Sequence, residues 1–231
     1  MTNRVFTDEE LEKMGKRTLD LLTEAIEAGD KEQAKNLANR MCSEFQWMHD
    51  FYLVSYISWE DYIYRNYGDD ALYQAIKEVE KKFALTAQDA MVDVRKVDFR
   101  LLVEGVMSRI RGHLQPAKVE EDDEKVCITM HPCGSGERAI QKGCYGPPCN
   151  ISRIQKPSPM TRGRTDFPIY CIHEANAEIL TIEHFGYPIV VTVPPEKVGG
   201  GEPCKLYMYK NPKDIPEAAY ARVGKQKPTN L

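Results

Sequence analysis

At positions 125–136 the sequence reads Lys125-Val126-Cys127-Ile128-Thr129-Met130-His131-Pro132-Cys133-Gly134-Ser135-Gly136. The apolar first half predicts a β-strand. The strand should stop near Pro132, because proline cannot donate a hydrogen bond to a sheet, and the glycines that follow permit a tight turn. His131 and Cys133 are therefore expected at the rim of a sheet.

The sequence changes in composition about ten residues before this stretch. All 14 prolines lie at Pro116 or beyond, together with ten of the 15 glycines and six of the seven cysteines. Proline interrupts helices, and proline and glycine favour turns. The predicted fold class is therefore α+β, with a helical bundle over residues 1–115 and a small, mainly antiparallel sheet domain rich in Cys, Gly and Pro over residues 116–231.

The helical half carries clear start and stop signals. Thr7 and Glu10 have the spacing of a capping box, and Gly68 has the position of a helix C-terminus. Helices are predicted over residues 7–29, 30–68, 71–83 and 86–111, and short loops between them favour an up-and-down bundle.

The second half carries short strand signals. Strands are predicted over residues 125–131, 167–173, 179–184, 189–193 and 205–209. Residues 199–201, which are all glycine, are expected at the tip of a hairpin between the last two strands. The acidic run at residues 120–124 is expected to be a solvated linker.

Two short tracts suggest a metal site. His131 and Cys133 are two positions apart, as are Cys171 and His173, and a strand turns such residues to the same face. If the two strand ends lie side by side, two imidazoles and two thiolates form a tetrahedral set suited to zinc. The sequence therefore predicts a zinc enzyme that hydrolyses or cleaves a small molecule with metal-bound water.

Three alternatives remain open. Cys144 and Cys149 with Cys133 and Cys171 would give four thiolates, enough for a structural zinc or an iron–sulfur cluster. Alternatively, Cys133 is a metal-free nucleophile, with backbone amides of the turn at residues 134–136 as the oxyanion hole. A non-catalytic module that binds a metal or senses oxidation is the third alternative.

Acid–base candidates lie close to the histidines. Glu174 follows His173 in the chain and Glu183 precedes a histidine, so either is expected to act as the base. His49 lies within an aromatic helical run and is a further catalytic candidate.

The substrate-binding candidates are aromatic, hydroxyl and basic residues. Tyr52 and Tyr56 lie on the same helical run as His49 and are expected to line a pocket, and Ser135 lies in the turn. Arg162 and Arg164 lie on a proline-broken loop and are expected to hold a carboxylate or phosphate, because guanidinium groups match such anions. The predicted substrate is therefore a small anionic molecule.

The overall charge and composition indicate which partners and which cellular location to expect. The net charge of −4 and the pI of about 5.8 do not favour a nucleic acid or an anionic membrane as partner. No secretory signal or membrane-spanning segment is evident, so a cytoplasmic location is expected. An odd number of cysteines without an export signal favours thiols or metal ligands over disulfides, and the aromatic helix is suited to a homodimer interface.

Part of the sequence resembles a known bacterial group. The tract His49-Asp50-Phe51-Tyr52, then Arg65-Asn66-Tyr67-Gly68-Asp69-Asp70-Ala71-Leu72 and a cysteine-bearing segment, resembles proteins grouped as L-2-amino-thiazoline-4-carboxylic acid hydrolase-like. The resemblance covers the middle of the chain and implies a hydrolase. It assigns no catalytic residue.

Overall fold

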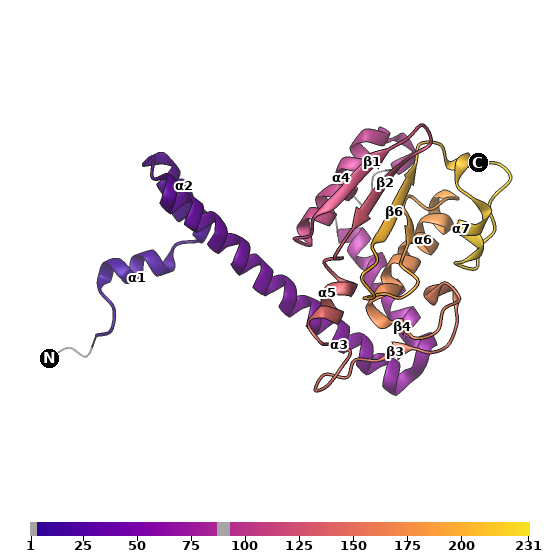
Figure 1. Cartoon of the computed structure of the whole chain (residues 1–231), viewed down its shortest axis with the longest axis horizontal. Helices are drawn as coiled ribbons and strands as arrows, with labels where there is room; N and C mark the ends of the chain where they lie inside the picture. Colours follow the sequence, from indigo (N-terminus) through magenta and orange to yellow (C-terminus); the bar gives the residue numbers. More distant parts are fainter. Residues whose placement is uncertain (1–3, 87–92) are drawn as a thin grey trace. The chain divides into compact units, whose positions relative to one another are not determined.

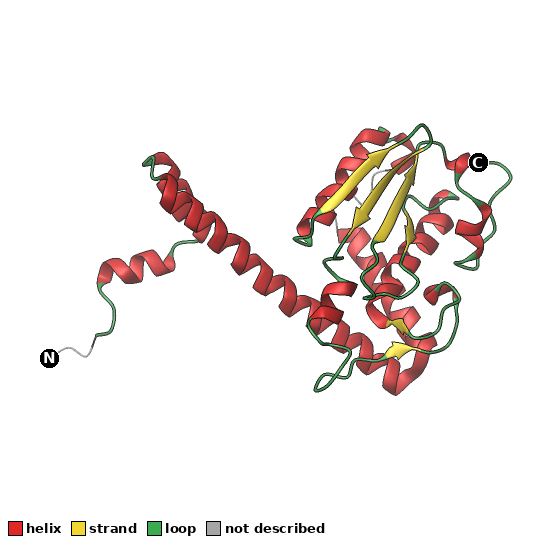
Figure 2. Cartoon of the chain, viewed as in Figure 1, coloured by secondary structure: helices red, strands yellow, loops and turns green. Residues whose placement is uncertain are grey.

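The computed structural model describes residues 4–86 and 93–231. A helix-rich N-terminal region precedes a small antiparallel sheet, which confirms the predicted α+β class (Figure 2). By its internal contacts the chain divides into two compact units, residues 1–52 and 53–231. This division differs from the predicted boundary at residue 115, because the helices after residue 52 share a core with the cysteine-rich half.

The N-terminal unit contains α1 (Asp8–Gly15), α2 (Thr18–Glu27) and the first part of α3 (Lys31–Thr86). The capping box at Thr7 and Glu10 is confirmed, since each side chain accepts a hydrogen bond from the other's backbone N–H. The predicted helix over residues 7–29 is instead two helices, because α1 ends at Gly15.

The long helix α3 is interrupted at Gly68, as the sequence predicts. Gly68 has φ +83° and ψ −176°, a conformation that glycine adopts without the steric cost of a Cβ atom. After residue 52, α3 contributes the buried side chains Leu53, Ile57, Leu72 and Ile76 to a core. Their partners come from the cysteine-rich half and include Ile154, Phe167, Ile169 and Ile172.

The main sheet has four antiparallel strands in the order β1-β2-β6-β5. They are β1 (Ala117–Glu121), β2 (Lys125–Met130), β5 (Val191–Val193) and β6 (Cys204–Tyr209). The predicted hairpin through residues 199–201 is confirmed by the pairing of β5 with β6. The linker predicted at residues 120–124 is partly wrong, because β1 pairs with β2 through Glu121. A second ribbon pairs β3 (Arg153–Ile154) with β4 (Phe167–Pro168).

Figure 1 shows α4 beside β1 and β2, and α6 and α7 on the side of β6. Helix α4 (Phe99–Gly112) packs through Ile110 on the face that carries Ile128 and Leu206. Helices α6 (Ile172–Phe185) and α7 (Glu217–Ala221) pack on the face that carries Val191 and Tyr207. Along β6 the side chains alternate, so Leu206 and Met208 face α4 while Tyr207 and Tyr209 face the other side.

Two predicted strands and one helix start are wrong. Residues 172–185 form α6, which ends in a left-handed cap at Gly186, so neither 167–173 nor 179–184 is a full strand. Only Phe167–Pro168 pairs, and a turn of 3₁₀-helix, η4 (Ile169–Cys171), leads into α6. The fourth helix starts after the capping residue Asp98 instead of Thr86, and Asp89 lies outside the described residues.

Short elements complete the chain: η2 (Val94–Lys96), α5 (Gly136–Gln141), η3 (Pro159–Thr161) and η5 (Pro212–Asp214). Among residues 4–86 and 93–231, no helix combines the length and the apolar character that a membrane crossing requires.

Candidate functional site

A cavity of about 320 Å³ lies within the C-terminal unit. Its wall includes residues of α4, the loop after β2, the start of α6, the segment after β5 and the start of β6. Three cysteines, Cys133, Cys171 and Cys204, contribute to this wall. We call this space the thiol cavity.

Each thiol reaches the cavity from a different element. Cys133 lies three residues after the end of β2, Cys171 ends η4, and Cys204 begins β6 directly opposite Met130 of β2. Gly136 makes the close approach of these segments possible, since a Cβ atom there would lie 2.6 Å from the Cys171 sulfur. Any larger residue at this position would displace the thiol.

Two thiols of the cavity wall keep their protons to higher pH than usual. Burial raises the pKa of Cys171 and of Cys204, and the proximity of other ionisable thiols raises both further. The sulfur of Cys133 lies 3.2 Å from the Ser135 hydroxyl oxygen. The Cys133 backbone N–H donates to Glu137, at 2.9 Å, which fixes the start of the turn.

Glu174, in the first turn of α6, also lines the thiol cavity. Its carboxylate accepts a hydrogen bond of 3.0 Å from the Thr192 hydroxyl. Burial raises the pKa of Glu174, although the positive charge of Arg162 and the hydrogen bond from Thr192 act in the opposite direction. A carboxyl group that keeps its proton to higher pH than usual is suited to general-acid chemistry.

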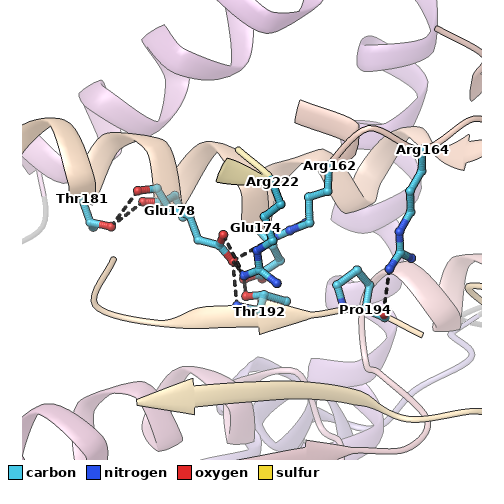
Figure 3. A network of polar contacts seen from close by, with 9 residues as sticks. Arg162, Arg164, Glu174, Glu178, Thr181, Thr192, Pro194 and Arg222 are labelled. Carbon is cyan, nitrogen blue, oxygen red and sulfur yellow. Dashed lines mark hydrogen bonds and ion pairs between the residues drawn. The ribbon is translucent and has the colours of Figure 1, made fainter. Parts of the chain in front are cut away.

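A buried ion network borders the cavity at α6 (Figure 3). The carboxylate of Glu178, whose side chain is 1% exposed, accepts hydrogen bonds from Arg162 at 2.8 Å and from Arg222 at 3.0 Å. It also accepts the backbone N–H of Thr192 at 2.7 Å. The network therefore joins α6, β5, the loop after η3 and the C-terminal segment.

His173 is held between two carboxylates of α3. Its Nε2 contacts Glu60, and its Nδ1 lies 3.2 Å from Glu80. Asn176 donates to the other oxygen of Glu80 at 2.6 Å, and the ring of Tyr56 packs 5.1 Å from the imidazole. Both ring nitrogens are therefore engaged by protein groups that lie far away in the sequence.

The predicted convergence of four zinc ligands is not found. Cys133, Cys171 and His173 all line the thiol cavity, but both ring nitrogens of His173 face Glu60 and Glu80. His131 is not part of the wall, and its side chain is 50% exposed and 3.9 Å from Glu137. Within the described residues, no group of three or more His, Cys, Asp or Glu side chains is arranged to hold a metal ion. The physical reason is that Cys171 and His173 lie on a helical segment and do not share a strand face.

The predicted cluster ligands do not join the cavity either. Cys144 is buried, Cys149 is exposed, and neither is part of the wall. Zinc and the iron–sulfur cluster therefore stay predictions.

Of the other predicted catalytic and substrate-binding residues, some line the thiol cavity and some do not. Ser135 and Arg162 line the cavity with Glu174. Glu183 lies at the surface in ion pairs with lysines. The guanidinium of Arg164 donates to the carbonyls of Pro194 and Pro195, which themselves line the cavity, so Arg164 positions the segment after β5.

The aromatic-helix candidates fall in different units. His49 and Tyr52 belong to the N-terminal unit, where His49 Nδ1 lies 3.3 Å from Asp50 and Tyr52 is exposed. Tyr56 belongs to the C-terminal unit and packs on His173 and Tyr170.

The residues predicted from sequence do not include Cys204, Glu178 or the carboxylates around His173. A signal for Cys204 was present, because the predicted last strand begins beside it. Antiparallel pairing with the strand at residues 125–131 would have placed Cys204 near the turn that holds Cys133. No comparable pattern along the chain points to Glu178, Glu60 or Glu80.

We expect stability to fall as the pH rises through the titration of His173. Burial disfavours the charged imidazole, but hydrogen bonds and charges from Glu60 and Glu80 outweigh it and raise the pKa of His173 from 6.5 to about 9. The native state therefore binds more protons than the unfolded state in this range, and the stabilisation present below pH 6.5 is lost towards about pH 9. Urea unfolding across this range measures the effect. The slope should shrink in a His173→Gln variant, and a profile that rises with pH in the wild type would contradict the assignment.

Comparison with known proteins finds no match to this chain. No family model, no curated protein and no solved structure matches the chain. The resemblance to hydrolase-like bacterial proteins therefore stays a prediction.

Proposed function

We propose that the protein is an enzyme that cleaves a small molecule by nucleophilic attack of the Cys133 sulfur. The observation that carries this proposal is the presence of Cys133, Ser135 and Glu174 in the wall of one cavity. The volume of about 320 Å³ suits a small molecule. Raised pKa values make Cys171 and Cys204 poor nucleophiles. We assign the role to Cys133, because its sulfur lies 3.2 Å from the Ser135 hydroxyl oxygen.

The proposed chemistry is acyl transfer followed by hydrolysis. The Cys133 thiol gives its proton to solvent, and the sulfur forms a bond to the electrophilic carbon with the Ser135 hydroxyl donating to the thiolate. The bond to the leaving group breaks, and the leaving group takes the electron pair and the proton of Glu174. Water then attacks the thioester, returns a proton to Glu174 and releases Cys133.

An activated ester tests this proposal. We expect p-nitrophenyl acetate to give a burst of nitrophenolate and an acetyl group on Cys133, detected by peptide mass spectrometry. A Cys133→Ser variant should lose the burst. Cys127→Ser is the matched control, because Cys127 lies on β2 outside the cavity wall and should leave the burst intact.

Two outcomes would overturn the proposal. One is acetylation of Cys133 no faster than that of the exposed Cys149 in the same molecule. The other is stoichiometric metal in the purified protein that is lost in Cys133→Ser, which would restore the zinc hypothesis.

A further inference from the structure

The guanidinium of Arg162 is buried with too few partners. Its side chain is 3% exposed, and only Nη2 has a partner, at 2.8 Å on Glu178. Nε and Nη1 are buried without a hydrogen-bond acceptor among the described residues. A buried donor without a partner costs about 1–3 kcal/mol, and more for a charged group, so such groups are rare in folded proteins unless a ligand completes them.

Two guanidinium groups of the network meet at one carboxylate. Arg162 and Arg222 share the carboxylate of Glu178 (Figure 3). Glu174 lies one turn earlier on α6, and its carboxylate accepts a hydrogen bond from the Thr192 hydroxyl. Sharing one acceptor leaves donors of Arg162 available to a further anion.

The backbone also holds Arg162 in a costly conformation. Arg162 has φ +54° and ψ 39°, the left-handed region that favours glycine. Such a conformation costs about 1–3 kcal/mol for an ordinary residue and concentrates at functional sites. The N–H of Arg162 bonds the carbonyl of Pro159 at 3.1 Å, and the capping box of Ser158 and Thr161 fixes this turn.

We infer that Arg162 forms a binding position for the carboxylate group of a small substrate in the thiol cavity. The two unpartnered donors of one guanidinium match the two oxygens of a single carboxylate. The field of Arg162 reaches the cavity wall, because it lowers the pKa of Glu174, Cys171 and Cys204 against the effect of burial. This inference rests on the proposed function and names the substrate class for it.

Two alkylating reagents that differ in charge test the inference. Iodoacetate and iodoacetamide react alike, since the thiolate sulfur bonds to carbon and iodide leaves with the electron pair of the broken bond. We expect the ratio of the iodoacetate rate to the iodoacetamide rate to be about tenfold higher at Cys133 than at the exposed Cys149, because one nearby charge attracts only the anionic reagent. Peptide mass spectrometry measures both sites in one sample.

Variants of Arg162 test whether its positive charge causes the preference for iodoacetate. Arg162→Gln should bring the ratio at Cys133 down to that at Cys149, and Arg162→Lys should retain part of the preference. Arg153→Gln is the matched control, because Arg153 contacts Asp166 outside the cavity wall and should leave the ratio unchanged. A high ratio that persists in Arg162→Gln would overturn the inference.

A binding measurement makes the test independent of thiol reactivity. Acetate at constant ionic strength should raise the urea midpoint of the wild type and not that of Arg162→Gln, because a ligand stabilises only the state that binds it. Equal shifts in both proteins would overturn the inference. Fast alkylation of Cys133 without a preference for iodoacetate would reject only the carboxylate-binding role of Arg162. If Cys133 shows no selective reaction but acetate still shifts the urea midpoint in an Arg162-dependent way, only the role of Cys133 as nucleophile is rejected.

Discussion

Replacing His173 by alanine is expected to lower the free energy of unfolding by about 3–5 kcal/mol. The imidazole lies between Glu60 and Glu80, and its removal leaves Glu60, which is 4% exposed, without its hydrogen-bond partner. A buried carboxylate without a partner bears the full cost of its lost hydration. Urea unfolding monitored by circular dichroism measures the change.

His131→Ala is the matched control for this prediction. The His131 side chain is half exposed and 3.9 Å from Glu137, so its loss should change the unfolding free energy by less than about 1 kcal/mol. If both histidines were zinc ligands, both substitutions would release metal and destabilise the protein. Similar large losses in the two variants would therefore contradict the structural role given to His173.

Replacing Glu178 by alanine is expected to have an effect of the same size, about 3–5 kcal/mol. Its carboxylate, 1% exposed, is the shared acceptor of Arg162 and Arg222 and also takes the backbone N–H of Thr192. Without it two guanidinium groups remain close together with no counterion. The hydrogen bonds that Glu178 makes to β5 and to the C-terminal segment are lost together.

Glu183→Ala on the same helix provides the control for Glu178. Glu183 is 38% exposed and contacts Lys77 and Lys225, and exposed ion pairs contribute about 0–1 kcal/mol. The two substitutions remove the same side chain from one helix, so a difference of several-fold measures the effect of burial. An equal, small loss at Glu178 would show that the arginine network does not contribute to stability.

The candidate site could be predicted only in part. Short-range patterns predict Cys133 and Ser135 in a turn after a strand, and the cavity also contains the predicted residues Cys171, Glu174 and Arg162. The prediction of both histidines as metal ligands depends on a strand, because an alternation of histidine and cysteine puts the two side chains on one strand face. Residues 172–185 have enough apolar character for either structure, and packing against the sheet selects the helix.

The features that can be predicted from the sequence are those that depend on residues close together in the chain. Capping at Thr7, the break at Gly68 and the strand over residues 125–130 depend on neighbouring residues along the chain, so the order of amino acids predicts them. Tertiary structure alone decided the partners of His173, since Glu60 and Glu80 lie 113 and 93 positions away in the chain. The pKa values and the binding positions depend on burial and on the charges of such distant groups. Both conditions exist only in the folded chain.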